Sequence, residues 1–436
     1  MEDTKKKLLV YAHYYHPDVA STGQILKELC EGMLDEFNIT VICTVPSYTG
    51  TVEEHYKNEK YYHENINGVQ VLRVAVPEFS KENKKSRIKN LVAYSFRAVI
   101  ATLKLPKQDY IFTISQPPIL GGVLGVLGKW FKGGKLIYNI QDFNPEQTMA
   151  VGYSKNKAIL NIAMMVDKFS CRQADKVIVV GRDMQETLRN RFNNINVPRN
   201  VFINNWIDEK EIYPLPENHE KVLAFKKKYD LENKTVIMYS GNIGLYYDLE
   251  NLIKVIKRFK DRNDVVFAFV GDGTKKKDIE SYATEHNMNN VTFIPYQDKS
   301  DLIYSLNAGD VHWVVNAKGI KGISVPSKLY GVMAAGKTVF GVLEEGSEAR
   351  LIIEDCNCGV CIEPSNYELI YQELKDVMEN IDKYKRLGIN GKEYVDKYIK
   401  KDVAIEKYSR EILCEVEKLT EVDSKERMSI QETKNV

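Results

Sequence analysis

The feature that most constrains the fold is a regular alternation of apolar, β-branched runs with amphipathic helical patterns, and it occurs in both halves of the chain. In the first half, runs such as LLVYAH, ITVICTV, DYIFTIS and KVIVV are separated by segments such as STGQILKELCEGML. The second half repeats the theme with KTVIMYSG, VVFAFVG, DVHWVV and TVFGVL. Strands that alternate with helices predict parallel sheets covered by helices. The predicted fold class is therefore α/β, with two Rossmann-like domains.

The chain divides near residues 204–220, where a strand-like run gives way to prolines and a charged stretch. A length of 436 residues suits two domains better than one core. Two such domains place the carboxyl ends of their strands across a cleft, where ligands of these sheets bind. We assign an N-terminal domain to 1–207, a C-terminal domain to 208–395, a C-terminal helix to 396–420, and a tail predicted to be disordered to 421–436.

Composition excludes several classes of function. The formal net charge is +1, so no polyanionic partner is indicated and we expect no nucleic-acid binding. The cluster CNCGVC is the only grouping of cysteines and has no fourth ligand nearby, so buried thiols are favoured over zinc and no metal site is predicted. We see no signal peptide and no apolar run near the roughly 20 residues of a membrane helix, and we expect a cytoplasmic protein.

Glycine-containing turns follow several predicted strands of the second half. Glycine at a strand-to-helix turn lets backbone amides approach an anion, and the helix dipole favours negative charge there. An ordinary tight turn, or a turn with an aspartate cap, is the alternative at each place. The residues at these strand ends are Ser240, Gly241, Asn242, Gly271, Asp272, Pro295 and Tyr296.

The stretch VPSKLYGVMAAGKTV predicts a helix that begins beside Pro326 and leads through a glycine into a strand. Proline suits a helix entry, and Ser327 can cap the free amides of the first turn. A diphosphate at this end would meet the amides of Ser327 to Leu329, the positive end of the helix dipole and the ammonium of Lys328. The alternative for Lys328 is a solvated surface lysine.

The first half offers a second set of candidates at its own strand ends. Gly23 and Gln24 lie in the predicted turn between the first strand and a helix, with His16 close by in the sequence. Asp142 comes just after another strand, where a carboxylate is well placed to bind a hydroxyl group or assist chemistry. Its alternative role is to cap the loop, which continues with an Asn-Pro-Glu run.

A basic, amphipathic segment spans residues 84–104. Lysines and arginines cluster near its beginning, and leucine, valine, isoleucine and phenylalanine recur along it. Such a segment can lie on an anionic membrane surface. A surface helix that packs on its own sheet has a similar pattern, so the two interpretations remain open.

Nine stretches between Tyr11 and Pro364, among them YYHPDVASTGQILKELCEGM, YNIQDFNPEQTMAVG, YSGNIGLYYDLENLI and VPSKLYGVMAAGKTV, resemble the retaining glycosyltransferases of family four in order and spacing. The subgroup that the chain looks most like acts in bacterial capsule, O-antigen and exopolysaccharide assembly. The resemblance implies the two-domain GT-B fold, with C-terminal helices that cross back to the N-terminal domain. It also implies a cytoplasmic enzyme at the inner face of the plasma membrane.

The resemblance further implies that the enzyme moves a hexose or N-acetylhexosamine from a nucleotide sugar, usually UDP-linked, to a lipid-linked or polysaccharide acceptor with retention of configuration. It implies no cofactor and no metal, and no Asp-x-Asp motif occurs in the chain. Lys328 and Asp142 are the expected catalytic residues. The expected donor-binding residues are Gly23, Gln24, Ser240, Gly241, Asn242, Gly271, Asp272, Pro295, Tyr296, Pro326, Ser327, Lys328 and Leu329; the expected acceptor-binding residues are His16, Gln141 and Asn144.

Three positions depart from the family pattern. A glutamate common in the helix of the VPSKL stretch falls at Gly331, and basic residues that usually follow the GN-G turn are replaced by Leu245, Tyr246 and Tyr247. The usual histidine-aspartate pair reads Gln-Asp here. These departures support the alternative of a non-catalytic binding or complex-forming subunit. A nucleotide-sugar epimerase is a third interpretation.

Overall fold

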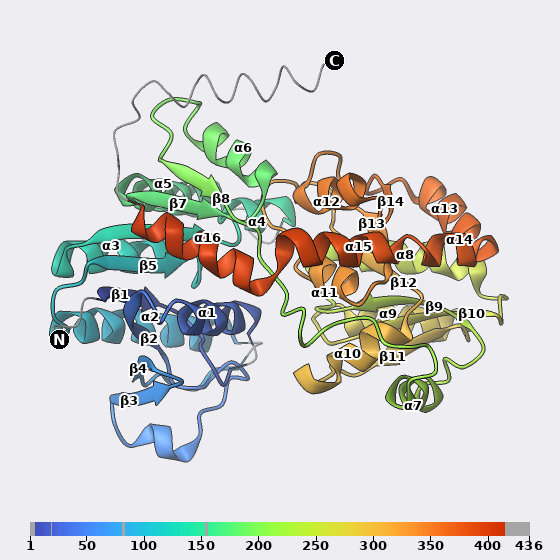
Figure 1. Ribbon diagram of the computed structural model, residues 1–436, viewed down its shortest axis with the longest axis horizontal. Helices are drawn as coiled ribbons and strands as arrows, with labels where there is room; N and C mark the ends of the chain where they lie inside the picture. Colours follow the sequence, from blue (N-terminus) through green and yellow to red (C-terminus); the bar gives the residue numbers. More distant parts are fainter. Residues whose placement is uncertain (1–4, 19, 81–82, 153–155, 415–436) are drawn as a thin grey trace.

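The computed structural model describes residues 5–18, 20–80, 83–152 and 156–414, which form two parallel-sheet domains lying side by side (Figure 1). This confirms the α/β class predicted from the alternating pattern. The predicted disordered tail at 421–436 lies outside the described residues. In the part of the chain that is described, no helix is both long and apolar enough to span a bilayer.

The first sheet has the strand order β3-β4-β2-β1-β5-β6-β7-β8, and β3, which pairs antiparallel with β4, is its one antiparallel strand among the described residues. Its strands are β1 Lys6–Tyr11, β2 Phe37–Thr44, β3 Tyr61–Ile66, β4 Val69–Val74, β5 Tyr110–Ile114, β6 Lys135–Ile140, β7 Lys176–Val179 and β8 Asn200–Phe202. The helices of this half are α1 Ser21–Gly32, α2 Lys84–Lys104, α3 Leu120–Lys132, α4 Glu146–Ala150, α5 Lys157–Gln173 and α6 Arg182–Arg191.

Side-chain alternation along β1 explains how helices cover both faces of this sheet. Leu9 and Tyr11 pack in one apolar cluster with residues of α2 and α3. Leu8 and Val10 point to the opposite face and pack in another cluster with α1 and the last helix of the chain. Both faces are therefore buried, as expected of a parallel sheet.

The second sheet is parallel throughout, with the order β11-β10-β9-β12-β13-β14. Its strands are β9 Thr235–Ser240, β10 Val265–Val270, β11 Val291–Ile294, β12 Val311–Val315, β13 Thr338–Val342 and β14 Gly359–Ile362. The helices of this half are α7 Glu220–Lys228, α8 Leu249–Ile256, α9 Lys276–Glu285, α10 Lys299–Ala308, α11 Lys328–Ala334, α12 Glu348–Cys356, α13 Tyr367–Glu379 and α14 Ile381–Lys385.

The end of the chain returns to the first domain, as the family resemblance implied. Helix α15 (Gly388–Tyr394) continues through a π-helical turn into α16 (Lys401–Leu413), which crosses in front of the first sheet in Figure 1. The hydroxyl of Tyr408 accepts a hydrogen bond from Asn139 Nδ2 at 3.1 Å, and Lys176 forms an ion pair with Glu411 at 2.8 Å. Helix α16 is thus part of the core of the first domain.

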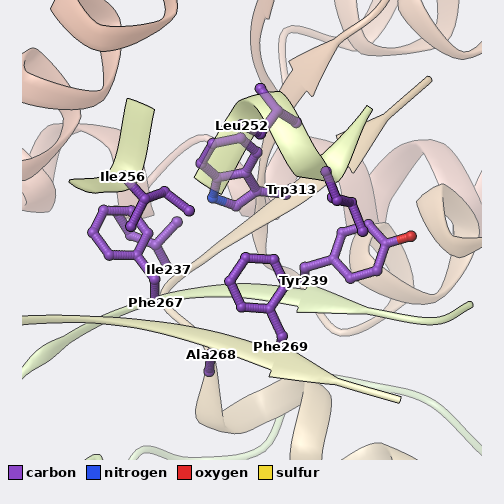
Figure 2. A pocket seen from close by; sticks show the side chains of 9 residues that line it. Ile237, Tyr239, Leu252, Ile256, Phe267, Ala268, Phe269 and Trp313 are labelled. Carbon is purple, nitrogen blue, oxygen red and sulfur yellow. The ribbon is translucent and has the colours of Figure 1, made fainter. Parts of the chain in front are cut away.

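The core of the second domain contains a small enclosed cavity of about 10 Å³, room for one water at most. Its walls are apolar, with Trp313, Phe267 and Phe269 among them (Figure 2). Tyr239 also lines it, and its hydroxyl points away from the other lining side chains (Figure 2). The cavity is a packing gap, and the polar end of Tyr239 lies outside it.

Candidate active site

The two domains meet where strands of both sheets end. The loop that precedes α11 lies against the loop that follows β6: Phe143 N donates to Ile323 O at 2.9 Å, and Asp142 forms an isolated antiparallel bridge with Ser324. This contact brings the loop of Asp142 and the start of α11, where Lys328 stands, to the same place. Two of the predicted site regions, far apart in the sequence, therefore adjoin.

Lys328 is held by two tyrosines at the start of α11. Its ammonium donates a hydrogen bond to Tyr239 Oη at 2.6 Å, and Tyr239 in turn donates to Asn242 O at 2.6 Å. Nζ lies 4.0 Å from the ring centre of Tyr239 and 3.8 Å from that of Tyr247. Burial lowers the pKa of Lys328 well below its ordinary value, although part of the side chain remains exposed. The described contacts give the ammonium no carboxylate partner, which leaves its charge available to an entering anion.

Tyr247 connects Lys328 with Asp142. Burial raises the pKa of the Tyr247 hydroxyl to about 12, and the charge of Asp142 contributes in the same direction. Burial also raises the pKa of Asp142 from 3.8 to about 6, against a hydrogen bond from Gln147 Nε2 at 3.3 Å. Burial shifts the pKa values of Asp142 and Lys328 toward their neutral forms, and such shifts cluster at functional sites.

Two glycine turns lie side by side next to Lys328. Gly241 follows β9 with φ +141°, and a Cβ built on it would lie 3.6 Å from Lys328 Cε. Gly271 follows the neighbouring strand β10 with φ +136°, and a Cβ there would lie 2.1 Å from Gly241 O. Both positions require glycine, because their backbones are left-handed in φ and, at Gly271, because no side chain fits. The amide of Gly241 donates to Val270 O at 2.9 Å and that of Gly271 to Ile294 O at 3.0 Å, so the two glycines bring the chain close to the ammonium while their own amides stay bonded within the sheet.

The remaining strand-end residues take different positions. Asp272 caps its own turn, since Gly273 N donates to its Oδ1 at 2.8 Å. Pro295 O accepts from Gln297 Nε2 at 2.7 Å, and the side chain of Tyr296 is 57% exposed. Because β9, β10 and β11 are adjacent and parallel, all of these residues lie on the same edge of the second sheet as Gly241.

The capping role expected at the start of α11 is wrong. Ser327 has helical angles and makes no side-chain cap hydrogen bond, and α11 has only seven residues. Leu329 N donates to Pro326 O at 3.1 Å, and the Leu329 side chain is fully buried. The amide of Leu329 is therefore used within the chain, and the group on α11 that faces the cleft is Lys328.

Several expectations for the first domain are also corrected. Gly23 and Gln24 lie inside α1 and not in the turn before it, and Gln24 N already bonds to Ala20 O at 3.1 Å. Gly23 allows α1 to approach the loop after β1, where a Cβ would meet Tyr14 O at 3.0 Å. His16 is exposed. Partial desolvation is the main cause that lowers the pKa of its imidazole, and the positive charge of Lys27 is the second. These residues lie on the strand-end side of the first domain.

The side chain of Gln141 points into the protein. Its Nε2 donates to Asn139 Oδ1 at 2.7 Å, and its Oε1 accepts from Asn205 Nδ2 at 2.7 Å. The side chain of Gln141 is therefore buried and hydrogen-bonded at both ends within the protein. Asn144 is also buried, and its carbonyl accepts from Arg191 Nη2 at 2.8 Å. The direction in which Gln141 turns after the strand depends on Asn139 and Asn205, and the local sequence pattern does not predict it.

Position 331, where the family pattern has a glutamate, lies in the middle of α11. A Cβ built on Gly331 would point toward α10, and the nearest described atom outside its own helix and chain neighbours is Leu306 Cδ1 at 3.4 Å. Lys328 is the residue of this helix that reaches Tyr239 and Tyr247. The site is thus built from a lysine and two tyrosines, without a carboxylate from α11.

Two residues that hold the site together, Tyr247 and Glu348, are not predicted as site residues by the sequence pattern. In the sequence, Tyr247 is notable only because it replaces a basic residue of the family pattern, yet in the structure its ring covers Lys328. Glu348, almost fully buried, accepts from Arg182 Nε at 2.9 Å and from Asn204 Nδ2 at 3.0 Å, and so joins the two domains. The roles of Tyr247 and Glu348 depend on contacts with residues far away in the sequence, so the local pattern does not separate them from ordinary polar residues.

No group of three or more histidine, cysteine, aspartate or glutamate residues in the described ranges is arranged to hold a metal ion. The seven cysteines are free thiols, and four of them are buried. In the cluster CNCGVC, Cys358 is fully buried and Cys356 is partly exposed.

Two family models match the chain in succession. The model described as "Glycosyl transferase 4-like domain" matches residues 22–206, and the model described as "Glycosyl transferases group 1" matches residues 221–394. The chain belongs to glycosyltransferase family four. The matches cover the second sheet and all of the first except β1, so the contact between Asp142 and Ser324 lies between the two domains of a glycosyltransferase.

Relatives of this glycosyltransferase carry names of the same kind. A protein of Pseudomonas aeruginosa named as a glycosyltransferase, WbjE, is 27% identical over 69% of this chain and 75% of its own length. A protein of Escherichia coli named as a colanic acid biosynthesis glycosyl transferase, WcaI, is 24% identical over 93% of this chain and 99% of its own.

Solved structures show that the glycosyltransferase has the GT-B fold. Sucrose-phosphate synthase of Thermosynechococcus elongatus superposes with a TM-score of 0.73 at 14% identity, covering 93% of this chain and 98% of the other. HepE of Anabaena, solved in complex with UDP and glucose, superposes with a TM-score of 0.67 at 13% identity, covering 93% and 99%. At these identities the likeness concerns the fold alone.

Proposed function

We propose that this glycosyltransferase transfers a hexose or N-acetylhexosamine from a UDP-linked sugar to a lipid-linked or polysaccharide acceptor, with retention of configuration and without a metal ion. The observation that carries the proposal is the ammonium of Lys328, which lies beside the paired glycine turns of Gly241 and Gly271 and lacks a described carboxylate partner. A diphosphate seated on these turns would provide the missing negative charge. The complex of HepE with UDP and the name of WcaI support the donor and acceptor classes.

In the proposed reaction the bond between the anomeric carbon and the diphosphate oxygen breaks, and the acceptor oxygen bonds to the same face of that carbon. The acceptor proton passes to the departing phosphate oxygen. Negative charge grows on the diphosphate as the bond breaks, and Lys328 stabilises it most at that moment. The incoming diphosphate also favours the charged form of Lys328, which burial alone disfavours. The rings of Tyr239 and Tyr247 hold the ammonium in place between turnovers.

Asp142 lies on the first-domain side of the same cleft. We assign it to binding a sugar hydroxyl, because an ionised carboxylate accepts hydrogen bonds from hydroxyl groups and because it follows β6 at the strand-end edge.

A panel of nucleotides and nucleotide sugars tests the donor assignment. UDP and at least one UDP-sugar are expected to raise the melting temperature of the full chain in EDTA, with a stabilisation of about 2.7 kcal/mol at a ligand concentration 100 times Kd. GDP and dTDP sugars serve as matched controls. A shift by a UDP-sugar without any hydrolysis or transfer would indicate a non-catalytic binding subunit. No shift with any nucleotide would contradict the proposed donor.

The raised pKa of Asp142 predicts linked effects of pH on activity and stability. The pKa of Asp142 is about 6 in the folded state and 3.8 ordinarily, so folding favours the protonated carboxyl. The contribution of Asp142 to the free energy of unfolding is therefore fully present below pH 3.8 and is lost as the pH rises through 6. Transfer by the native enzyme is expected to fall below pH 6. Asp142→Asn is expected to lower transfer at every pH and to raise the free energy of unfolding at pH 8 by up to about 3 kcal/mol.

The stability difference between Asp142→Asn and the native chain should vanish near pH 4, and urea unfolding at the two pH values measures it. Asp35→Asn is the matched control, because Asp35 is exposed and precedes β2, at the strand edge opposite the cleft. Equal stability of native chain and Asp142→Asn at pH 8 would contradict the buried carboxylate.

A further inference from the structure

Helices α2, α3 and α5 form one continuous outer face of the first domain. Residues of α2 and α3 pack together in the apolar cluster on one side of the first sheet. The ring of Trp130 on α3 lies edge-on to that of Phe169 on α5, with 6.1 Å between the ring centres. We call the outward surface of these three helices the α2–α3–α5 face.

The α2–α3–α5 face exposes many large apolar side chains. Phe96 of α2 is 66% exposed, Met165 of α5 is 64% exposed and Trp130 of α3 is 58% exposed. Scattered exposed apolar residues are normal, but a set gathered on adjacent helices marks an interaction site. The exposed apolar residues of this face are Ile88, Val92, Phe96, Leu103, Trp130, Phe131, Ile159, Ile162, Met165 and Phe169.

The same face is strongly basic, although the whole chain is nearly neutral at +1. The sequences of α2, α3 and α5 contain eleven lysines and arginines and a single acidic residue, Asp167. Asp167 is buried and paired with Arg191, so it adds no negative charge to the surface. One of the basic residues, Lys129, is neutralised by Asp175 at 2.6 Å. The excess of positive charge therefore remains on the outside, next to the apolar side chains.

We propose that the α2–α3–α5 face docks on the surface of a bilayer that contains anionic phospholipids. Exposed tryptophan, phenylalanine, isoleucine and methionine side chains can enter the boundary between headgroups and acyl chains, while the lysines and arginines attract the anionic headgroups. A hollow of about 330 Å³ on α5, lined by Asn161, Met164, Met165, Lys168 and Arg172, combines apolar and cationic groups in the same way. The basic segment at 84–104 forms only part of this surface.

Helix α5 also connects the α2–α3–α5 face to the cleft. On its inner side, Asp167 accepts from Arg191, and Arg191 binds Glu146 through both carboxylate oxygens at 2.5 and 2.6 Å. Glu146 begins α4, four residues after Asp142. Through Arg191, a docked enzyme would thus link its acceptor-side loop to the helix that touches the lipid. This last point rests on the proposed lipid-linked acceptor, whereas docking itself does not.

Co-flotation of the full chain with lipid vesicles tests the proposal. The protein is expected to float with vesicles of phosphatidylcholine and phosphatidylglycerol but only weakly with pure phosphatidylcholine. Binding should decrease as salt rises, because ions screen the attraction to the headgroups. Equal binding to both vesicle types, or no binding to either, would overturn the proposal. The thermal shift with UDP is measured on the same samples, so that loss of docking and loss of donor binding are distinguished.

A pair of substitutions locates the contact. Ile162→Asp combined with Met165→Asp is expected to weaken vesicle binding by about tenfold or more, because it removes apolar contact and adds two negative charges. Ile389→Asp on α15 is the matched control, since Ile389 is 53% exposed on the second domain and should float like the native chain. Lys85→Gln with Lys89→Gln should lower binding without altering any apolar group.

Circular dichroism and melting temperature establish that each variant folds. If Ile162→Asp with Met165→Asp fails to fold, Lys85→Gln with Lys89→Gln still tests the docking proposal, because both lysines are exposed and lie outside the core. Unchanged flotation of both folded variants would overturn the proposal. If the lipid-free native chain is a dimer in solution and Ile162→Asp with Met165→Asp makes it monomeric without changing flotation, the face is instead an interface between two copies.

Discussion

Replacing Lys328 with alanine is expected to lower turnover by about 100- to 1000-fold, the loss typical of removing one preorganised group that stabilises developing charge. Lys328 lies beside the glycine turn that follows β9, where the leaving diphosphate is proposed to lie. Stability should not fall in parallel, because burial opposes the charged form of this side chain and its removal relieves that cost. Initial rates with the UDP-sugar identified by the donor panel measure the effect.

Lys375→Ala is the matched control for this substitution. Lys375 is on α13 and is half exposed at 50%, with one weak partner, Glu379, at 3.8 Å. It should leave turnover and melting temperature unchanged. A Lys328→Ala enzyme that folds normally and retains full turnover would remove Lys328 from the mechanism.

Arg191→Ala is expected to lower the free energy of unfolding by about 3–5 kcal/mol, the cost of leaving buried carboxylates without their partner. The guanidinium binds Glu146 through two hydrogen bonds, pairs with Asp167, donates to Asn144 O and lies 4.3 Å from the ring centre of Phe143. Its neighbours raise its own pKa, which indicates that the charged form is strongly favoured there. Urea unfolding at pH 7 measures the loss.

Two further variants show whether the effect comes from the buried network. Arg191→Lys should recover only part of the stability, since an ammonium cannot bind one carboxylate through two parallel hydrogen bonds. Arg258→Ala should cost far less than Arg191→Ala, because its pair with Glu368 is solvent-exposed. Equal losses for Arg191→Ala and Arg258→Ala would contradict the network.

The sequence predicts the fold well because the relevant signals are local and repeated. Each apolar run named at the start of the sequence analysis forms a buried strand; β9 and β10 are examples. The runs are apolar throughout because a parallel sheet buries both faces and needs apolar side chains on each. Glycines at the ends of these strands were also informative. At Gly241 and Gly271 the backbone has positive φ, and few other residues adopt that conformation at low cost.

The site could be predicted only in part, because the direction of a side chain after a strand depends on residues far away in the sequence. Gln141 and Asp142 are adjacent, yet Gln141 turns inward to Asn139 and Asn205, while Asp142 accepts a hydrogen bond from Gln147 and pairs through its backbone with Ser324 of the second domain. The same limit applies to Tyr247, whose ring meets Lys328 only after 80 residues of chain have returned to the same sheet edge. The local sequence pattern does not predict such long-range contacts.

The return of α16 to the first sheet has a consequence for synthesis on the ribosome. Tyr408 is 1% exposed, and its ring lies 5.9 Å from that of Trp206 and 6.2 Å from that of Phe112, measured between ring centres. One face of the N-terminal domain is therefore covered by residues that are translated only after the second domain. Domains commonly fold in the order in which they emerge. Here the nascent N-terminal domain keeps one apolar face uncovered until the second domain and α16 have been synthesised.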